Sequence, residues 1–352
     1  MRFYTEQHRF YGGVDLHARM LAVCILDAEG QVVCEAKLAA TPRAFLDAVA
    51  PYRTSPRGLV VACECMFAWY WLADLCAAEG IPFVLGHALY MKAIHGGKAK
   101  NDRIDAEKIA RLLRGGTLPQ AYVYPKGMRA TRDLLRRRTF LVRRRAELLA
   151  HLVNTNSQYN QPALTQKLCY AGNRAALDLP GRFAEPSVRT NVATDLALID
   201  ALDDQVRALE LYLTRTAKVD DPQAYHRLQT IPGVGKVLAL IFLYEIHDVR
   251  RFEEGGQFLS YARLVRCAHE SAGKKVGSGG AKIGNAHLKW AFGEAACLLV
   301  RASAQAKQWL ARREKKHGKA RALGALAARL GRAVYHLLRK KEAFDAQRFF
   351  AS

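Results

Sequence analysis

The stretch Lys98-Ala-Lys-Asn-Asp102-Arg-Ile-Asp105-Ala-Glu-Lys-Ile-Ala110 places two carboxylates three residues apart where a helix is expected to begin. Apolar residues at helical spacing support that helix, and an i, i+3 spacing puts both acids on one of its faces. Two such acids repel each other unless a cation or a proton lies between them. Lys98 and Lys100, directly upstream, are candidates for a phosphate contact. Acids are also common at helix N-termini because the helix dipole favours them, so this pair gains weight only if other acids converge on it.

The chain before this stretch alternates between short apolar runs and helical segments. The run Gly58–Cys63 is wholly apolar, as expected for a strand buried on both faces. The order of elements is β-β-β-α-β-α-β-α, which is the topology of ribonuclease-H-like nucleases and integrases. The expected strands are Phe10–His17, Met20–Leu26, Gln31–Leu38, Gly58–Cys63 and Ile81–Leu85, and the expected helices run from Thr41 or Pro42 to Ala50 and from Phe67 to Ala78.

In that topology, acids on the first strand, at the end of the fourth strand and on the last helix meet at one edge of the sheet. These positions are held by Asp15, Glu64, Asp102 and Asp105. Each acid taken alone is also an ordinary solvated loop residue. Four carboxylates in one place do not all stay ionised without a cation, and oxygen ligands suit Mg²⁺. The sequence therefore predicts a site for one or two Mg²⁺ ions, the arrangement used in phosphodiester cleavage.

Composition indicates an ordered protein that binds a polyanion. The chain has 352 residues, enough for two domains or more, and a formal net charge of +22. Nucleic acid is the first candidate partner and an anionic membrane surface the second. The sequence has no apolar run long enough to span a bilayer, and its first residues lack the apolar core of a signal peptide. Eight scattered cysteines fit reduced thiols in a cytoplasmic protein.

The middle of the chain is helical and strongly basic. The segment from Arg132 to Glu147 combines an apolar stripe with a dense guanidinium face, and we expect few acidic partners for its arginines. That favours contact with phosphates, of RNA or of DNA, over a merely solvated face. A near-heptad stripe in Val192–Ala217 predicts pairing with this helix or with another subunit as a coiled coil, and Pro162–Arg189 is expected to be a loop. The arginines are Arg132, Arg136, Arg137, Arg138, Arg143, Arg144 and Arg145.

The segment Arg227–Ile241 carries an IPGVG turn between two helical runs, which is typical of a helix-hairpin-helix. Gly233 and Gly235 supply the backbone angles of the turn. Free amides at the following helix start, beside Lys236, are suited to hold a DNA phosphate without reading bases. A simple packing corner between two helices is the alternative.

Further along, Cys267–Lys289 is rich in glycine and lysine and is expected to be a loop that moulds around a nucleic-acid backbone. Its basic and polar candidates are Lys274, Lys275, Lys282 and Asn285. The loop also contains Ser271 and Ser278. A serine hydroxyl attacks phosphorus only when a metal or a nearby base activates it, so from spacing alone each is an ordinary loop serine. The chain from Ala302 to Phe350 is expected to be helical and basic.

Two blocks of sequence resemble a known family. The first block comprises GGVDLHARM around Asp15, ACE at Glu64 and KAKNDRIDAEKIARLL at Asp102 and Asp105. The second block, in the C-terminal third, comprises SYARL, the serine segment and the GN-LK element at Asn285. These blocks are similar to those of the DEDD transposases of the insertion-sequence family IS110, relatives of the Piv DNA invertase.

This resemblance implies a recombinase that moves a mobile element by cutting and rejoining DNA. It implies that Ser271 is the nucleophile and forms a covalent phosphoserine, with Ser278 as the second choice. It also implies a noncoding bridge RNA that pairs with donor and target DNA, and a dimer on RNA that becomes a tetramer on DNA. The chain differs from the family pattern at Arg263, at Arg266 and in the Ala272-Gly273 step. These differences bear on the conformation of the serine loop and not on its place in the chain.

The sequence thus predicts an α/β protein with an all-α part, in three domains. Residues 1–125 form a RuvC-like (ribonuclease-H-like) metal-binding domain, 126–220 an arginine-rich helical coiled-coil segment, and 221–352 a mainly helical domain with the helix-hairpin-helix and the serine loop. We expect a cytoplasmic, nucleoid-associated transposase. Two alternatives remain: a Holliday-junction-type metal-dependent endonuclease without a covalent intermediate, and a nucleic-acid-binding protein with an inactive nuclease fold.

Overall fold

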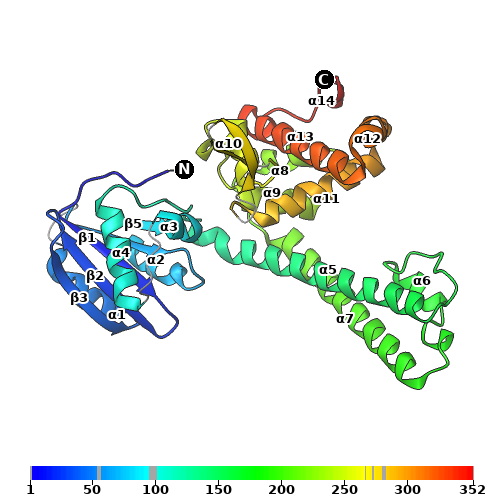
Figure 1. The fold of residues 1–352 in the computed structure, drawn as a ribbon, viewed down its shortest axis with the longest axis horizontal. Helices are drawn as coiled ribbons and strands as arrows, with labels where there is room; N and C mark the ends of the chain where they lie inside the picture. The colour runs from blue at the N-terminus through cyan, green and yellow to red at the C-terminus, as the bar shows by residue number, and fades with distance from the viewer. Residues whose placement is uncertain are drawn as a thin grey trace. The chain divides into compact units, whose positions relative to one another are not determined.

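The computed structural model describes residues 2–53, 57–94, 101–265, 267–271, 273–279 and 283–351, and of residues 93, 267–271 and 275–279 it describes the backbone alone. The chain divides into two compact units, Met1–Gly127 and Met128–Ser352 (Figure 1). This division lies close to the predicted boundary after residue 125, and the further boundary after residue 220 stays a prediction. None of the described helices is long and apolar enough to cross a membrane.

A five-stranded mixed sheet organises the first unit. β1 pairs antiparallel with β2 and parallel with β4, because a short turn joins β1 to β2 whereas the chain reaches β4 through a helix. The five strands expected from apolar runs and alternation are confirmed, with bounds within two residues of those predicted. The strands are β1 (Phe10–Leu16), β2 (Met20–Asp27), β3 (Val32–Ala39), β4 (Leu59–Glu64) and β5 (Phe83–Gly86), in the order β3-β2-β1-β4-β5 across the sheet.

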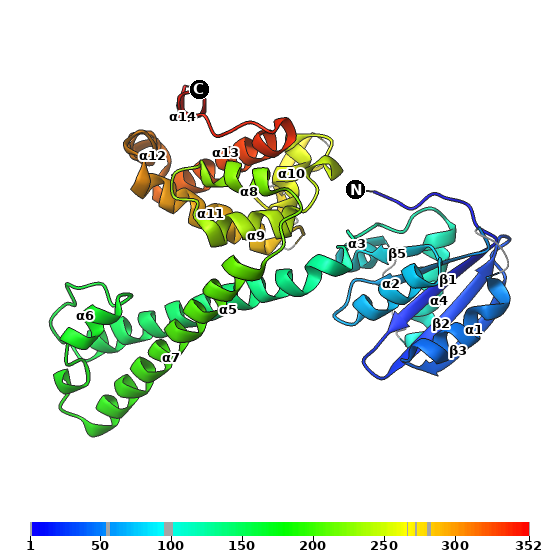
Figure 2. The same cartoon turned by 180° about the vertical axis from the view of Figure 1, so that it is seen from behind.

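Helices cover both faces of this sheet (Figures 1 and 2). α1 (Pro42–Val49) and α2 (Trp69–Ala78) pack on one face, through a core that includes Val14 and Cys63. α4 (Asp102–Arg114) covers the other face, where its alanines contact small residues of β2. A 3-10 turn, η1 (Ala50–Tyr52), follows α1, and α3 (Ala88–Ile94) follows β5.

The second unit begins with two long helices that lie side by side, α5 (Lys126–Gln158) and α7 (Pro186–Thr216) (Figure 1). They are antiparallel, because Arg138 pairs with Glu210 while His151, further along α5, pairs with the earlier Asp195. The near-heptad stripe of α7 therefore pairs with the arginine-rich helix, one of the two predicted partners. The segment expected to be a loop instead contains α6 (Ala171–Ala176) and η2 (Pro180–Arg182), and α7 begins within it; Leu168 and Phe183 are buried against α5 and α7.

The rest of the second unit is a helical domain around a large apolar core that includes Phe242, Phe258 and Phe292. The expected helices after residue 302 are confirmed. The elements are α8 (Pro222–Gln229), α9 (Lys236–Ile246), η3 (Val249–Arg251), α10 (Gly255–Tyr261), α11 (Ala286–Ala302), α12 (Ala304–His317), α13 (Lys319–Lys340) and α14 (Ala346–Phe350).

The serine segment is not the irregular loop that its glycines predict. It forms an antiparallel hairpin of β6 (Cys267–Ser271) and β7 (Lys274–Gly279). The turn includes Gly273, whose φ of +73° is a left-handed conformation that glycine adopts without strain. Short strand segments between glycines escape detection by hydrophobic periodicity, because each contains too few residues to establish an alternation.

Candidate functional site

Two of the predicted acids, Asp15 and Glu64, lie at the carboxyl ends of neighbouring parallel strands. The register pairs Val14 of β1 with Cys63 of β4, so Asp15 and Glu64 occupy the next position on each strand. Val14 and Cys63 are buried in the core beneath α1 and α2. Because successive side chains on a strand point to opposite faces, Asp15 and Glu64 are directed to the face that α4 covers.

Gly13 allows α4 to lie directly on β1. A Cβ atom at this position would be 2.1 Å from the carbonyl oxygen of Ala106 and 2.4 Å from the amide nitrogen of Ala110, both backbone atoms of α4. Any other residue here would separate the helix from the strand. The close approach places the first turn of α4 next to the end of β1, where Asp15 is.

α4 begins where the sequence predicts. The side chain of Asn101 accepts a hydrogen bond from the amide of Ile104 at 2.8 Å and so caps the helix. Asp102 and Asp105 consequently lie in the first helical turn, where the helix dipole favours negative charge.

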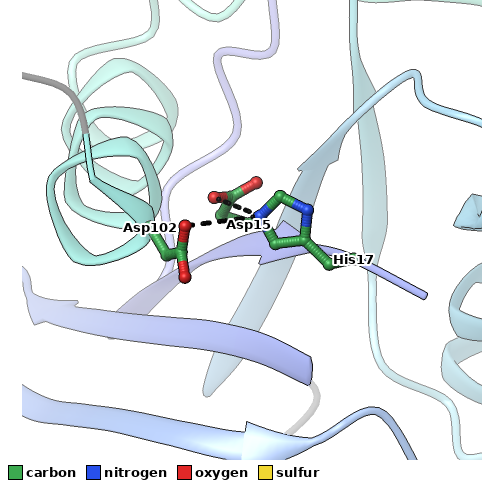
Figure 3. Close-up of side chains that lie close together, drawn as sticks. All are labelled: Asp15, His17 and Asp102. Carbon is green, nitrogen blue, oxygen red and sulfur yellow. Dashed lines mark hydrogen bonds and ion pairs between the residues drawn. The ribbon is translucent and has the colours of Figure 1, made fainter. Parts of the chain in front are cut away.

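Asp15 and Asp102 converge on a third residue, His17 (Figure 3). The Nε2 atom of His17 is 3.2 Å from Oδ2 of Asp15 and 3.5 Å from Oδ1 of Asp102, and one ligand atom from each of the three residues lies within 4.8 Å of the others. Carboxylate oxygens suit Mg²⁺ or Mn²⁺, whereas an imidazole suits softer divalent ions better. The three residues therefore fit a divalent cation. His17 was not predicted, although its i, i+2 spacing from Asp15 at a strand end indicates the same face.

The electrostatics of the cluster are those of acids competing for positive charge. Burial raises the pKa of Asp15; His17 opposes this effect, and the negative charges of Asp105 and Asp102 add to it. A hydrogen bond from Nζ of Lys37, at 2.9 Å, lowers the pKa of Asp102. The ammonium group of Lys37 thus already neutralises one of the carboxylates that a metal ion would use.

Asp105 and Glu64 lie outside the close three-residue group. Asp105 is 3.3 Å from Nζ of Lys108, and its charge still acts on Asp15. Glu64 is half-buried at the end of β4. The structure therefore brings Asp15 and Asp102 together, puts Asp105 within electrostatic range, and places Glu64 on the adjacent strand.

The arginines of α5 do have acidic partners, and the expectation that they lack them is wrong. The acids come from α7 and α9, 58 to 113 residues further along the chain, so the local sequence gives no sign of them. The partner of Arg144 is a near neighbour on α5 itself. The pairs are Arg132 and Arg136 with Glu245, Arg138 with Glu210, Arg144 with Glu147 and Arg145 with Asp203.

An exposed basic stripe remains on α5. Arg137, Arg143 and Arg144 are exposed, and the guanidinium groups of Arg137 and Arg144 lie 5.5 and 5.0 Å from the centre of the Phe140 ring. Arg143 lies 5.9 Å from the ring of Trp290. Guanidinium groups held against aromatic rings keep hydrogen-bond donors at their edge. Arg144 uses one of its donors for Glu147, and this stripe is still the part of the helix best suited to phosphates.

Glu245 of α9 connects two of the residues predicted to contact nucleic acid. Its carboxylate is 2 % exposed and accepts hydrogen bonds from Arg132 at 2.9 Å, Arg136 at 2.6 Å and Asn285 at 2.7 Å. Burial raises the pKa of Glu245, but the hydrogen bond of Arg136 and the charges of Arg132 and Arg136 outweigh it and hold that pKa at about 2. The sequence did not indicate these interior partners of Arg136 and Asn285.

The turn between α8 and α9 is as short as the IPGVG motif predicts. Gly233 has a φ of +87°, and a Cβ there would be 2.7 Å from the backbone carbon of Leu298 on α11. This close approach to α11 is compatible with both sequence interpretations, the helix-hairpin-helix and the simple packing corner. Gly235 precedes α9 in open space, so the amide at Lys236 begins the helix without crowding.

Ser271 is the last residue of β6 and pairs with Lys274, the first residue of β7, so it lies beside the turn of the hairpin. Lys274 is exposed. The side chains of Ser271, Lys275 and Ser278 are not described, and the predicted basic residues Lys98, Lys100 and Lys282 lie outside the described residues.

Two family models match the chain. The model described as "Transposase IS116/IS110/IS902 family" matches residues 225–311, which include the α8–α9 turn and the serine hairpin. A DEDD transposase model of IS110 elements, described as "Transposase", matches residues 12–160, which include the sheet, the acids and α5.

Individual relatives agree with these matches. The chain is 26 % identical over 350 residues to the transposase for insertion sequence element IS1111A of Coxiella burnetii, an alignment that covers 94 % of this chain and 90 % of that protein. It is 25 % identical over 311 residues to a probable family 20 transposase of Pseudomonas aeruginosa, covering 83 % and 84 % of the two chains.

The fold and these matches define a transposase of an insertion sequence, an enzyme that cuts and rejoins DNA. The chain belongs to the IS110 family of transposases, as its motifs predict. The DEDD type and the cluster of Asp15, His17 and Asp102 both indicate dependence on a divalent metal ion.

Proposed function

We propose that this transposase cuts and rejoins DNA strands in a Mg²⁺-dependent reaction that passes through a covalent phosphoserine at Ser271. Asp15, Glu64, Asp102 and Asp105 are the proposed metal-binding acids. The observation that carries the proposal is the convergence of Asp15 and Asp102 at one sheet edge, across a strand and a helix that Gly13 holds in contact.

The architecture of the first unit supports a RuvC-like domain. A β3-β2-β1-β4-β5 sheet in which β2 alone is antiparallel to both neighbours, with acids at the ends of β1 and β4 and on the helix over them, is the arrangement of ribonuclease-H-like nucleases. Bound between the acids, the metal ion would supply charge neutralisation at the scissile phosphate.

The proposed chemistry keeps the number of phosphodiester bonds constant. The Oγ atom of Ser271 loses its proton and forms a bond to phosphorus, while the bond to the leaving sugar oxygen breaks and that oxygen gains a proton. A hydroxyl of the new strand then attacks the phosphoserine and releases Ser271. The acids belong to the first unit and Ser271 to the second.

A noncoding bridge RNA is the proposed guide, and the exposed stripe of Arg137, Arg143 and Arg144 is its proposed contact on α5. Positive charge facing outward on a rigid helix suits a structured RNA, which proteins recognise largely by shape and backbone. The Lys274 side chain at the hairpin turn and the amides at Gly235 and Lys236 are the proposed DNA contacts, as parts of the serine hairpin and a helix-hairpin-helix. We further propose a homo-oligomer, a dimer on RNA and a tetramer on DNA.

Covalent trapping tests this function. A DNA substrate labelled on either side of the cut should become attached to the wild-type protein in the presence of Mg²⁺, and Ser271→Ala should abolish both the adduct and recombination. Ser278→Ala is the matched control in the same hairpin and should retain both. Asp15→Ala and Asp102→Asn should remove cleavage while the protein still binds nucleic acid.

Other outcomes select the alternatives. If Ser271→Ala cleaves DNA at the wild-type rate and no adduct forms, the protein is a hydrolytic endonuclease of the Holliday-junction type. If Asp102→Asn and Asp105→Asn together leave activity intact, the acid site is not catalytic.

A further inference from the structure

A cavity of about 480 Å³ lies in the C-terminal domain between α12, α13 and the last segment of the chain. Its volume falls in the range of ~300–1,000 Å³ that is usual for small-molecule sites. Its floor is formed by Ala325, Ala328 and Ala333, which lie along one face of α13. These small side chains leave room that leucine or phenylalanine at the same positions would fill.

Aromatic residues and an arginine give this cavity a defined wall. Trp309 and Phe349 line it and are buried, and the guanidinium group of Arg329 lies 5.9 Å from the ring of Trp309 and 5.1 Å from that of Phe349. Nε of Arg329 also donates to the carbonyl oxygen of Phe349 at 2.6 Å. The last segment of the chain is therefore tied down over the cavity and forms part of the wall.

The rim of the cavity is strongly basic. The acids that line it are Glu342 and Asp345: Glu342 is 3.8 Å from Arg348, and Asp345 caps α14 through the amide of the same residue. Burial lowers the pKa of His336, and the charges of Lys340, Arg332 and Arg348 lower it further. The basic lining residues are Arg313, Arg329, Arg332, His336, Lys340 and Arg348.

The four arginines and Lys340 outnumber the two acids, which favours an anionic occupant. An apolar floor and an aromatic wall beneath a cationic rim suit a ligand with a flat apolar part and a negatively charged part. A nucleotide has both.

We propose that this cavity binds one unpaired nucleotide of a single-stranded segment, with its base against Ala328 and the aromatic wall and its phosphate at Arg332 and the neighbouring rim. A base in a duplex is stacked and cannot enter, so the site selects single-stranded or extruded nucleotides. Val265, which also lines the cavity, is two residues before β6 begins at Cys267. The site goes beyond the proposed cleavage function, because neither the acids nor Ser271 takes part in it.

Photocrosslinking of the full-length protein tests this site. A short single strand that carries 5-iodouracil, prepared once as DNA and once as RNA, should crosslink to peptides containing Trp309, Phe344 or Phe349. Filling the cavity with Ala328→Phe and reversing a rim charge with Arg332→Glu should each reduce these crosslinks about tenfold or more, given that base stacking contributes ~1–3 kcal/mol. The DNA and RNA arms show which strand the site prefers.

The control is Arg339→Glu, an exposed residue of α13 that does not line the cavity, and it should leave the crosslinks unchanged. The proposal is overturned if Arg339→Glu loses the crosslinks to the same extent, or if a duplex crosslinks as well as a single strand. It is also overturned if inorganic phosphate competes fully at the concentration at which thymidine monophosphate competes. Ser271→Ala should retain the crosslinks. The crosslinking test of the cavity is therefore independent of the covalent-trapping test of the phosphoserine mechanism. Thermal unfolding tests whether Ala328→Phe is folded, and Arg332→Glu, a change at an exposed residue, repeats the test if it is not.

Discussion

Replacing Gly13 by alanine perturbs the contact that holds the acid cluster together. The new Cβ would lie 2.1 Å from the Ala106 oxygen and 2.4 Å from the Ala110 nitrogen, and Cβ contacts do not fall below 3.0 Å, so α4 has to move by about 1 Å. Overpacking of this kind costs ~1–3 kcal/mol of stability. A displacement of about 1 Å at a reacting centre can reduce the rate roughly 10²-fold. We therefore expect a moderate loss of stability and a severe loss of metal-dependent strand cleavage.

The neighbouring glycine supplies the control. A Cβ at Gly12 would lie 3.5 Å from side-chain atoms of Leu59 and Val61, which is ordinary van der Waals contact. Gly12→Ala should therefore cleave at close to the wild-type rate. Both variants are compared by denaturant unfolding and by single-turnover cleavage, at a temperature where each is folded and with saturating metal ion and DNA.

The clash at Gly13 involves backbone atoms, and this gives a second check. Trimming the helix side chain with Ala106→Gly should not rescue Gly13→Ala, because the carbonyl oxygen remains in place. Wild-type cleavage by Gly13→Ala, or equal losses in Gly12→Ala and Gly13→Ala, would refute the view that this contact positions Asp15 against Asp102.

Two further changes follow from charges described above. Lys37→Met removes the ammonium group that competes with a metal ion for Asp102. We therefore expect calorimetry to show that Mn²⁺ binds several-fold more tightly, roughly the effect of one exposed charge pair. The control, Arg103→Met, removes an ion pair with Glu35 and should not change the affinity. Glu245→Ala leaves the buried guanidinium group of Arg132 and the half-buried one of Arg136 without their carboxylate and should lower the free energy of unfolding by ~3–5 kcal/mol. The difference between the ordinary pKa of 4.5 and about 2 corresponds to about 3 kcal/mol. Because the pKa of Glu245 is lower in the folded than in the unfolded protein, this stabilisation is present above about pH 4.5 and is lost as the pH falls towards 2. If the wild type and Glu245→Gln show the same acid dependence of unfolding, Glu245 is not the source of this stabilisation.

The element order of the first unit follows from the sequence because its strands are apolar runs between short turns, and buried strands and amphipathic helices have different periods. The start of α4 is predictable for the same reason, since Asn101 has a capping side chain next to acids. The role of Gly13 is not predictable, because nothing local to a glycine in a strand says which element approaches it.

The candidate site could be predicted in part. Asp15 and Asp102 follow from topology, whereas His17 follows only once Asp15 is known to end a strand, so that the residue two positions later shares its face. The acidic partners of the α5 arginines could not be found, because Glu210 and Glu245 are distant in sequence and only the packing of α7 and α9 brings them close.

The bonds of Glu245 also have a mechanical consequence. Its carboxylate holds two arginines of α5 and, at the same time, Asn285, which directly precedes α11 and follows the serine segment. Arg263, just before that segment, donates to the carbonyl of Gly284 at 2.9 Å, so both ends of the segment are fastened to one another. α5 and the start of α11 are consequently joined through one buried carboxylate, so a displacement of α5 would act directly on a residue that flanks the serine segment.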